Sequence, residues 1–174
     1  MKWIVDPVHT HVGFSVRHMM VTTVRGSFTT FSGTFELDPA DFTKSQVTGE
    51  IDVASIDTKN ADRDTHLRTG DFFDAAAHPK ITFTSTKIEK KGDDYVVHGD
   101  LTLRGVTKSI ALDVEFAGVT KNAYAQTIIG VSAHGTISRE EFGVKYGNAL
   151  LETGGVAIGD KVKLEIEVQA RAEA

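Results

Sequence analysis

The chain has 174 residues, 40% of them hydrophobic and 25% charged, which are ordinary values for one globular domain with its own core. Its formal net charge of −5 argues against nucleic-acid binding, because phosphate recognition needs a basic face. The chain contains no cysteine, which excludes disulfides, thiol catalysis and thiolate metal sites.

The first residues do not form a secretory signal. Asp6 and Pro7 end the apolar stretch that follows Lys2, whereas a signal needs about 7–15 apolar residues. No segment approaches the roughly 20 apolar residues of a membrane-spanning helix. We therefore expect a soluble, cytoplasmic protein without a transmembrane segment. A periplasmic or secreted location is the alternative if a signal was removed.

Apolar and polar side chains alternate along eight segments, which is the period of a strand with two different faces. The predicted strands span residues 8–17, 28–37, 47–53, 81–86, 95–104, 109–116, 129–137 and 161–168. In the first of them, Val8, Val12, Phe14 and Val16 share the apolar face.

The connections between these segments carry turn and helix signals. Residues 91–94 and 104–107 have the glycine-containing composition of short hairpin turns. Asn60 precedes two acidic residues and Gly70 follows them, so a helical connection is predicted over residues 60–70. Ser138 and Glu141 match a capping box, which predicts a second short helix.

Eight strands with one apolar face each need a partner for that face. A sandwich or a closed barrel would supply it, and the mostly short connections favour an up-and-down antiparallel barrel without exposed edges. The interior of an eight-stranded barrel is either filled by side chains or able to hold one small ligand. That choice decides the function.

Ordered motifs cover nearly the whole chain. The most specific is Ser55-Ile56-Asp57-Thr58-x-Asn60-x-x-Arg63-Asp64-x-His66-Leu67-Arg68, followed by Asp71-Phe72-Phe73. The other motifs are Trp3-x-x-Asp6-x-x-His9, Phe14-x-Val16-x-His18, Val24-x-Gly26-x-Phe28-x-x-Phe31-x-Gly33, Pro79-x-Ile81-x-Phe83-x-Ser85-Thr86, Gly99-Asp100-Leu101-Thr102-Leu103-Arg104-Gly105-Val106-Thr107-Lys108, Ile137-Ser138-Arg139-x-x-Phe142-Gly143 and Gly159-Asp160-x-Val162. Together they resemble the YceI-like family, the lipocalin-like polyisoprenoid-binding proteins.

The resemblance implies one domain over residues 1–174, an all-β, eight-stranded antiparallel lipocalin-like barrel with short helical connections and a hydrophobic pore. It implies a long apolar ligand, whether a polyisoprenoid, a quinone-like lipid or a fatty chain, and no cofactor. Family members often form homodimers, and many are exported, although cytoplasmic members also fit the pattern. Homodimer formation and transient membrane contact therefore stay open for this chain.

The pore lining is predicted from the apolar strand faces together with the resemblance. The candidate ligand-binding residues are Val12, Phe14, Val16, Phe31, Phe35, Ile51, Phe72, Phe73, Ile81, Phe83, Leu101, Leu112, Val114, Phe116, Ile129, Val131 and Leu164. The chain has 10 phenylalanines, whose rings offer a ligand no polar group. Plain core packing is the alternative interpretation of these side chains.

Two polar groups contain the residue types of a metal site. His9 and His11 are spaced to share one strand face, and Asp62, Asp64 and His66 add further donors. The second group falls in the predicted helix, where positions i and i+2 do not share a face. We therefore predict no metal site and interpret both groups as solvated polar faces.

Arg63, Asp64 and His66 could also serve as acid and base in an enzyme. The chain has neither a cysteine nor a G-x-S-x-G motif to supply a nucleophile, so we predict that the protein is not an enzyme. In the resemblance this motif closes one end of the pore. Met19 and Met20 fit either an adaptable gate or surface packing.

Three functions stay open at this point. The first is a carrier or store for an isoprenoid or fatty lipid. The second is an enzyme that acts on a lipid inside the barrel, which requires a titratable group facing the interior. The third is a filled barrel with a protein-interaction or stress-response role.

Overall fold

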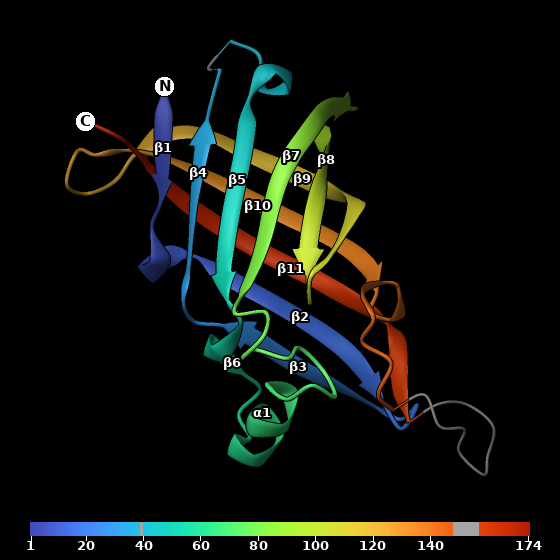
Figure 1. Cartoon of the computed structure of the whole chain (residues 1–174). Helices are drawn as coiled ribbons and strands as arrows, with labels where there is room; N and C mark the ends of the chain where they lie inside the picture. The colour runs from blue at the N-terminus through green and yellow to red at the C-terminus, as the bar shows by residue number, and fades with distance from the viewer. Residues whose placement is uncertain (39, 148–156) are drawn as a thin grey trace.

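The computed structural model describes residues 1–38, 40–147 and 157–174. Figure 1 shows a strongly curved sheet wrapped around an interior, with a short helix at one side. The strands are β1 (Lys2–Val5), β2 (His11–His18), β3 (Thr22–Phe28), β4 (Phe31–Glu36), β5 (Gln46–Asp52), β6 (Ile56–Asp57), β7 (Lys80–Lys91), β8 (Asp94–Leu103), β9 (Val106–Lys121), β10 (Thr127–Ser138) and β11 (Ile158–Ala172). The helix is α1 (Ala61–Leu67), and short 3-10 turns are η1 (Pro7–His9), η2 (Phe42–Lys44), η3 (Val53–Ser55) and η4 (Glu140–Phe142).

Eight strands form a closed antiparallel ring in the order β1, β4, β5, β7, β8, β9, β10 and β11, and β11 pairs back to β1. From β4 to β11 the neighbours around the ring follow one another in the chain, with only β6 left out (Figure 1). Closure pairs both edges of each ring strand, which removes the exposed edges of an open sheet. The predicted eight-stranded antiparallel barrel is confirmed.

One edge of β11 pairs with two different strands. Its residues 170–172 pair with β1 and close the ring, whereas its residues 158–167 pair with β2. β3 pairs with β2, and the two-residue β6 pairs with β3. The sheet therefore extends beyond the ring as the β2–β3 hairpin, with α1 beside it (Figure 1).

The break between β1 and β2 comes from Asp6 and Pro7. The Asp6 carboxylate accepts a hydrogen bond from the Val8 amide at 3.0 Å, and Pro7 fits the first turn of η1, where its missing N–H is not needed. The prediction of a strand from residue 8 is therefore wrong at its start. β2 begins at His11, and Val8 is 83% exposed rather than on the inner face.

The predicted helix over residues 60–70 is confirmed as α1, capped by Asn60, whose side chain accepts a hydrogen bond from the Arg63 amide at 3.0 Å. The second predicted short helix is present as the 3-10 turn η4, but the capping box at Ser138 is wrong. The Ser138 hydroxyl donates to Asp160 at 2.7 Å instead, because Ser138 is still the last residue of β10, and only η4 follows. Among the described residues, no helix is long and apolar enough to cross a membrane.

The barrel end near the chain termini is filled by side chains. Phe42 of η2 folds over this end and stacks on Phe116, with the ring centroids 5.0 Å apart. Tyr95 meets the same Phe42 ring edge-on at 4.7 Å, and Trp3 and Leu37 are buried in the same cluster. Burying one such side chain contributes roughly 1.5–3 kcal/mol. This closed end is therefore packed core.

Candidate functional site

Beyond the closed end the interior of the barrel is open. A cavity of about 550 Å³ is lined by side chains from every ring strand and from β2, β3 and α1. Ligand sites for small molecules have volumes of roughly 300–1,000 Å³ and are mostly apolar, so this cavity has the size and character of a binding site.

The predicted pore residues lie on the cavity lining, with two exceptions. Those on the lining are Val12, Phe14, Val16, Phe31, Phe35, Ile51, Phe72, Phe73, Ile81, Phe83, Leu101, Leu112, Val114, Val131 and Leu164. Phe116 and Ile129 are corrections, because neither lines the cavity. Ile129 is 0% exposed in the core cluster that includes the closed end, and Phe116 packs against that cluster and stacks on Phe42. That the lining residues bind a ligand stays a prediction.

Glycines on the inner face explain why the interior is not filled. A Cβ atom built at Gly26 would clash with the ring of Phe14, and one built at Gly99 would clash with the ring of Phe83. Both rings therefore lie against the barrel wall instead of reaching across it. Gly33 and Gly49 face each other on β4 and β5, so no side chain enters the interior from this pair.

Sequence reasoning missed part of the lining. Val24 and Phe28 of β3 lie on it, as do Val162, Ile166 and Val168 of β11. A signal existed for these residues, because they continue the period-two apolar pattern of their strands. Phe42 had no such signal, since it reaches the interior from a connection rather than from a strand.

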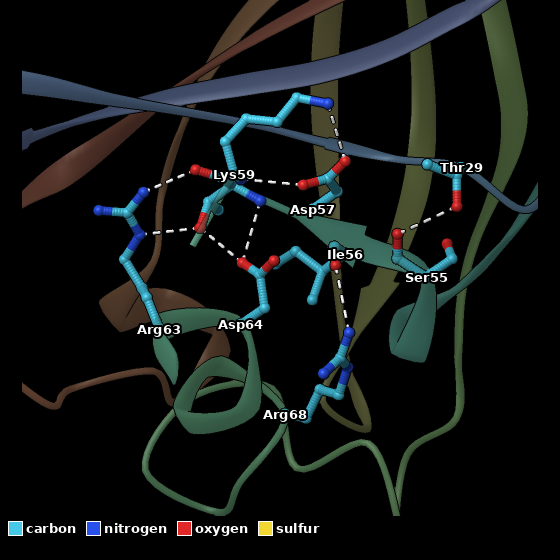
Figure 2. Close-up of polar contacts among 9 residues, drawn as sticks. Thr29, Ser55, Ile56, Asp57, Lys59, Arg63, Asp64 and Arg68 are labelled. Carbon is cyan, nitrogen blue, oxygen red and sulfur yellow. Dashed lines mark hydrogen bonds and ion pairs between the residues drawn. The ribbon is translucent and has the colours of Figure 1, made fainter. Parts of the chain in front are cut away.

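The most specific motif of the sequence fastens α1 to the chain before it, as Figure 2 shows. The buried Asp64 carboxylate accepts hydrogen bonds from the Thr58 amide at 2.9 Å and from the Thr58 hydroxyl. Arg63 donates through Nε to the Thr58 hydroxyl at 2.8 Å and through Nη2 to the Thr58 carbonyl at 2.7 Å. Arg68 donates to the Ala54 carbonyl at 2.9 Å. The structural role predicted for this motif agrees with these contacts.

The lining also includes buried or half-buried polar side chains, and we call one group of them the polar end of the cavity: Thr58, Arg63, His66 and Arg139. His66 is oriented by two kinds of contact. Its Nε2 lies 2.8 Å from the Asp71 carboxylate, and its ring meets Phe72 and Tyr146 edge-on at 5.0 Å. The polar end therefore offers fixed hydrogen-bonding groups beside an otherwise apolar space.

Arg139 holds the segment after β10 against the start of β11. Its guanidinium donates to the carbonyls of Gly159, Val144, Tyr146 and Ile158 at 2.7–3.0 Å. The side chain is 5% exposed, and this burial lowers the pKa of the guanidinium, although the charges of Asp160 and Glu140 oppose the shift. Arg139 therefore shapes the polar end through the backbone.

The histidine pair of the sequence does not share a strand face. His9 lies in η1, where its Nδ1 is 2.8 Å from the Asp6 carboxylate, and His11 starts β2. The predicted common face is wrong because Asp6 and Pro7 turn the chain into η1. No group of three or more His, Cys, Asp or Glu side chains suited to a metal occurs in residues 1–38, 40–147 and 157–174.

Comparisons with known proteins agree with this architecture. A UPF0312 protein of Staphylococcus epidermidis is 41% identical over 169 residues, which are 97% of this chain and 96% of that protein. The crystal structure of a Campylobacter jejuni YCEI protein is 38% identical, with a TM-score of 0.75 and coverage of 97% and 96%.

Two further solved structures share the fold. Burkholderia cenocepacia BcnA is 25% identical, with a TM-score of 0.80 over 95% of this chain and 98% of that one. A polyisoprenoid binding domain from Saccharophagus degradans has a TM-score of 0.74 at 19% identity, over 98% of both chains, and this likeness concerns the fold alone. The model of the YceI-like domain matches residues 3–170, so the chain belongs to the YceI-like family.

Proposed function

We propose that the protein binds one long apolar lipid inside its barrel and carries or stores it without changing it chemically. The observation that carries this proposal is the open, apolar cavity of about 550 Å³ inside a barrel whose other end is packed. Membership of the YceI-like family supports it. The Saccharophagus degradans protein of the same fold is described as a polyisoprenoid binding domain, which favours a similar ligand class here.

The two ends of the cavity suggest how such a lipid lies. An apolar tail would lie toward the closed end, where Phe35 and Phe42 belong to the lining. A polar head would lie at the polar end, beside Arg63 and His66. A polyisoprenoid, a quinone-like lipid or a fatty chain fits this orientation, because each joins a long tail to a small polar or anionic group.

The energetics favour carriage and storage over irreversible capture. One buried methylene gains about 0.8 kcal/mol relative to water, so a five-carbon isoprene unit gains roughly 3–4 kcal/mol before the costs of binding. Such lipids reside in bilayers, however, and moving a tail from a bilayer to an apolar cavity is nearly neutral. A barrel of this kind therefore exchanges its lipid with membranes reversibly.

We also propose that the protein does not change its ligand chemically, and the contacts of Asp64 and Arg63 support this part of the proposal. Both side chains hydrogen-bond to Thr58 and so hold α1 in place, which leaves the acid–base pair considered from the sequence occupied with a structural task. His66 is a titratable group on the cavity lining, and its Nε2 lies 2.8 Å from the Asp71 carboxylate. We propose a structural and head-group-binding role for His66.

A cytoplasmic location and a homodimeric state stay proposals that come from the sequence and the family resemblance. Cell fractionation with an antibody against the native protein tests the location. Light scattering coupled to size-exclusion chromatography tests the oligomeric state.

The experiment that tests the proposed function fills the cavity at Gly49. A Cβ at Gly49 has only the Ser32 carbonyl oxygen nearby, at 3.9 Å, so Gly49→Leu can place its side chain in the cavity without a backbone clash. Mass spectrometry after organic extraction should find an apolar lipid with the wild-type protein and much less with Gly49→Leu. Gln46→Leu, at an exposed position on the outer face of the same strand, is the matched control and should keep its lipid.

The same variants settle the alternative of a filled barrel. Wild-type protein would then carry no lipid and take up neither added cis-parinaric acid nor geranylgeraniol. Gly49→Leu would in that case resemble the control in every binding measurement.

A further inference from the structure

The turn between β2 and β3 exposes three apolar side chains. Met19, Met20 and Val21 are 42%, 51% and 74% exposed, and we call them the apolar tip. The Val21 amide donates to the His18 carbonyl at 3.1 Å, which closes a tight turn with Met19 and Met20 at its centre. Figure 1 shows this turn at the end of the molecule away from the two chain termini.

The backbone of this turn does not favour methionine. Met19 and Met20 have φ values of 53° and 61°, in the left-handed region that suits asparagine and glycine. A residue with a Cβ atom costs roughly 1–3 kcal/mol in sparsely populated regions of this kind. Folding alone would therefore be served better by Asn-Gly. The two apolar side chains are kept exposed at a cost, which indicates a contact outside the barrel.

The cavity reaches the apolar tip. Its lining includes Val16 and His18 at the end of β2, Val24 on the facing strand and Ile158 at the start of β11. His18 is the last residue before the tip, so the space that would hold a lipid chain comes within one residue of the exposed methionines. A lipid that enters or leaves at this end passes beside the tip.

Three cations lie on the outer face behind the tip. Ser15 of β2 pairs with Arg25 on β3 and with Lys163 on β11, so these two cations flank it in one row across the sheet. Arg17 lies two residues further along β2, opposite Thr23. Arg17, Arg25 and Lys163 form no ion pair within the described part of the chain, although the whole chain has a net charge of −5.

We propose that this end of the barrel docks on an anionic lipid bilayer, with the apolar tip in the acyl boundary and the three cations over the head groups. This arrangement matches the way peripheral proteins combine apolar insertion with electrostatic attraction. The proposal rests on the proposed lipid-binding function and adds the route by which the lipid moves. The lipid passes directly between bilayer and cavity, without crossing water.

Vesicle flotation tests the docking. Wild-type protein should float with vesicles of phosphatidylcholine mixed with phosphatidylglycerol, remain unbound with phosphatidylcholine alone, and detach as the salt concentration rises. Met19→Asn combined with Met20→Gly should weaken vesicle binding about tenfold, because the apolar insertion is lost. These residues suit the left-handed backbone, so the variant should fold at least as well as the wild type.

Matched variants separate the docking end from the rest of the surface. Arg25→Gln with Lys163→Gln should weaken binding to the anionic vesicles about tenfold or more, because each cation near an anionic surface adds electrostatic attraction. Lys90→Gln with Lys121→Gln removes the same charge from exposed positions on β7 and β9 and should bind like wild type. Tyr124→Asn removes an 85% exposed apolar side chain from the turn between β9 and β10 and should also have no effect.

A second measurement keeps the docking proposal apart from the function on which it rests. cis-Parinaric acid added from ethanol reaches the cavity through water, so the tip variant should bind it as tightly as wild type. Transfer of the same probe from anionic vesicles to the tip variant should be about tenfold slower. If the wild-type protein does not bind the probe at all, the proposed lipid-binding function is wrong.

Two outcomes overturn the docking proposal while lipid binding stands. One is equal flotation of the tip variant, the charge variant and their controls. The other is a wild-type dimer in solution that becomes monomeric in the tip variant and does not bind vesicles, since the tip would then be a contact between two copies of this chain.

Discussion

Phe83 is the residue at which a hollow barrel and a filled barrel differ most in stability. Its ring covers Gly99 on one side, and its other side borders the cavity. Phe142 provides the comparison, because it is 1% exposed, belongs to a core cluster and does not line the cavity. Cutting either phenylalanine to alanine removes the same atoms from very different surroundings.

The magnitudes follow from those surroundings. A phenylalanine packed on all sides costs about 3–5 kcal/mol when it is replaced by alanine, because the lost burial is joined by a new cavity. Phe83 borders an existing space, so it has partners to lose on one side only. We expect Phe83→Ala to cost about 1–2 kcal/mol in lipid-free protein, whereas Phe142→Ala should cost the full range. Phe116→Ala belongs with Phe142→Ala, because its ring stacks on Phe42.

Urea unfolding followed by circular dichroism measures these free energies, first on lipid-free protein and then with saturating lipid. A ligand present at about 100 times its Kd stabilises the folded state by about 2.7 kcal/mol, and Phe83→Ala should lose part of this gain. Thr84→Ala, on the outer face of β7, should leave it unchanged. If Phe83→Ala costs as much as Phe142→Ala and lipid has no effect on either, the interior is packed core and the reasoning fails.

Two further predictions concern the polar contacts. The hydrogen bond with His9 lowers the pKa of the Asp6 carboxyl below its ordinary value of 3.8. This contribution to stability is present above pH 3.8 and is lost as pH falls through the lowered pKa. In acid titrations the free energy of unfolding should therefore fall less steeply with decreasing pH in Asp6→Asn than in the wild type. Arg139→Leu leaves the four backbone carbonyls without their donor and should cost more than about 3 kcal/mol in urea unfolding, while Arg139→Lys recovers part of it.

The fold was largely predictable because period-two alternation is a local property of each strand. β3 was missed because the inner face of this short strand offers only Val24 and Phe28, separated by Gly26, whose space is taken by Phe14 from the neighbouring strand. β1 escaped because only four residues precede its end at Val5.

The sequence predicts which face of each strand points into the barrel, but not how far along the barrel each inward residue lies. Alternation places Phe116 and Ile129 on the same side of their strands as Leu112 and Val131, and all four lie in or against one core cluster. Whether a residue meets the cavity or the closed end depends on how far along the barrel it lies. Phe42 sets where the closed end begins, because it folds in from a connection and stacks on Phe116. Nothing local to Phe42 in the sequence indicates this contact.

The open interior follows from a feature that the sequence does contain. Gly26, Gly33, Gly49 and Gly99 all fall at inward positions, between apolar residues that line the cavity. A strand interior normally disfavours glycine, since it packs nothing and costs chain entropy. At Gly26 and Gly99 the missing side chain lets a phenylalanine ring lie flat on the wall, and at Gly33 it makes room for the Val5 side chain. At Gly49 it leaves open space, because a Cβ there would have only the Ser32 carbonyl oxygen nearby. The stability given up at these inward positions thus contributes to the space available to a ligand.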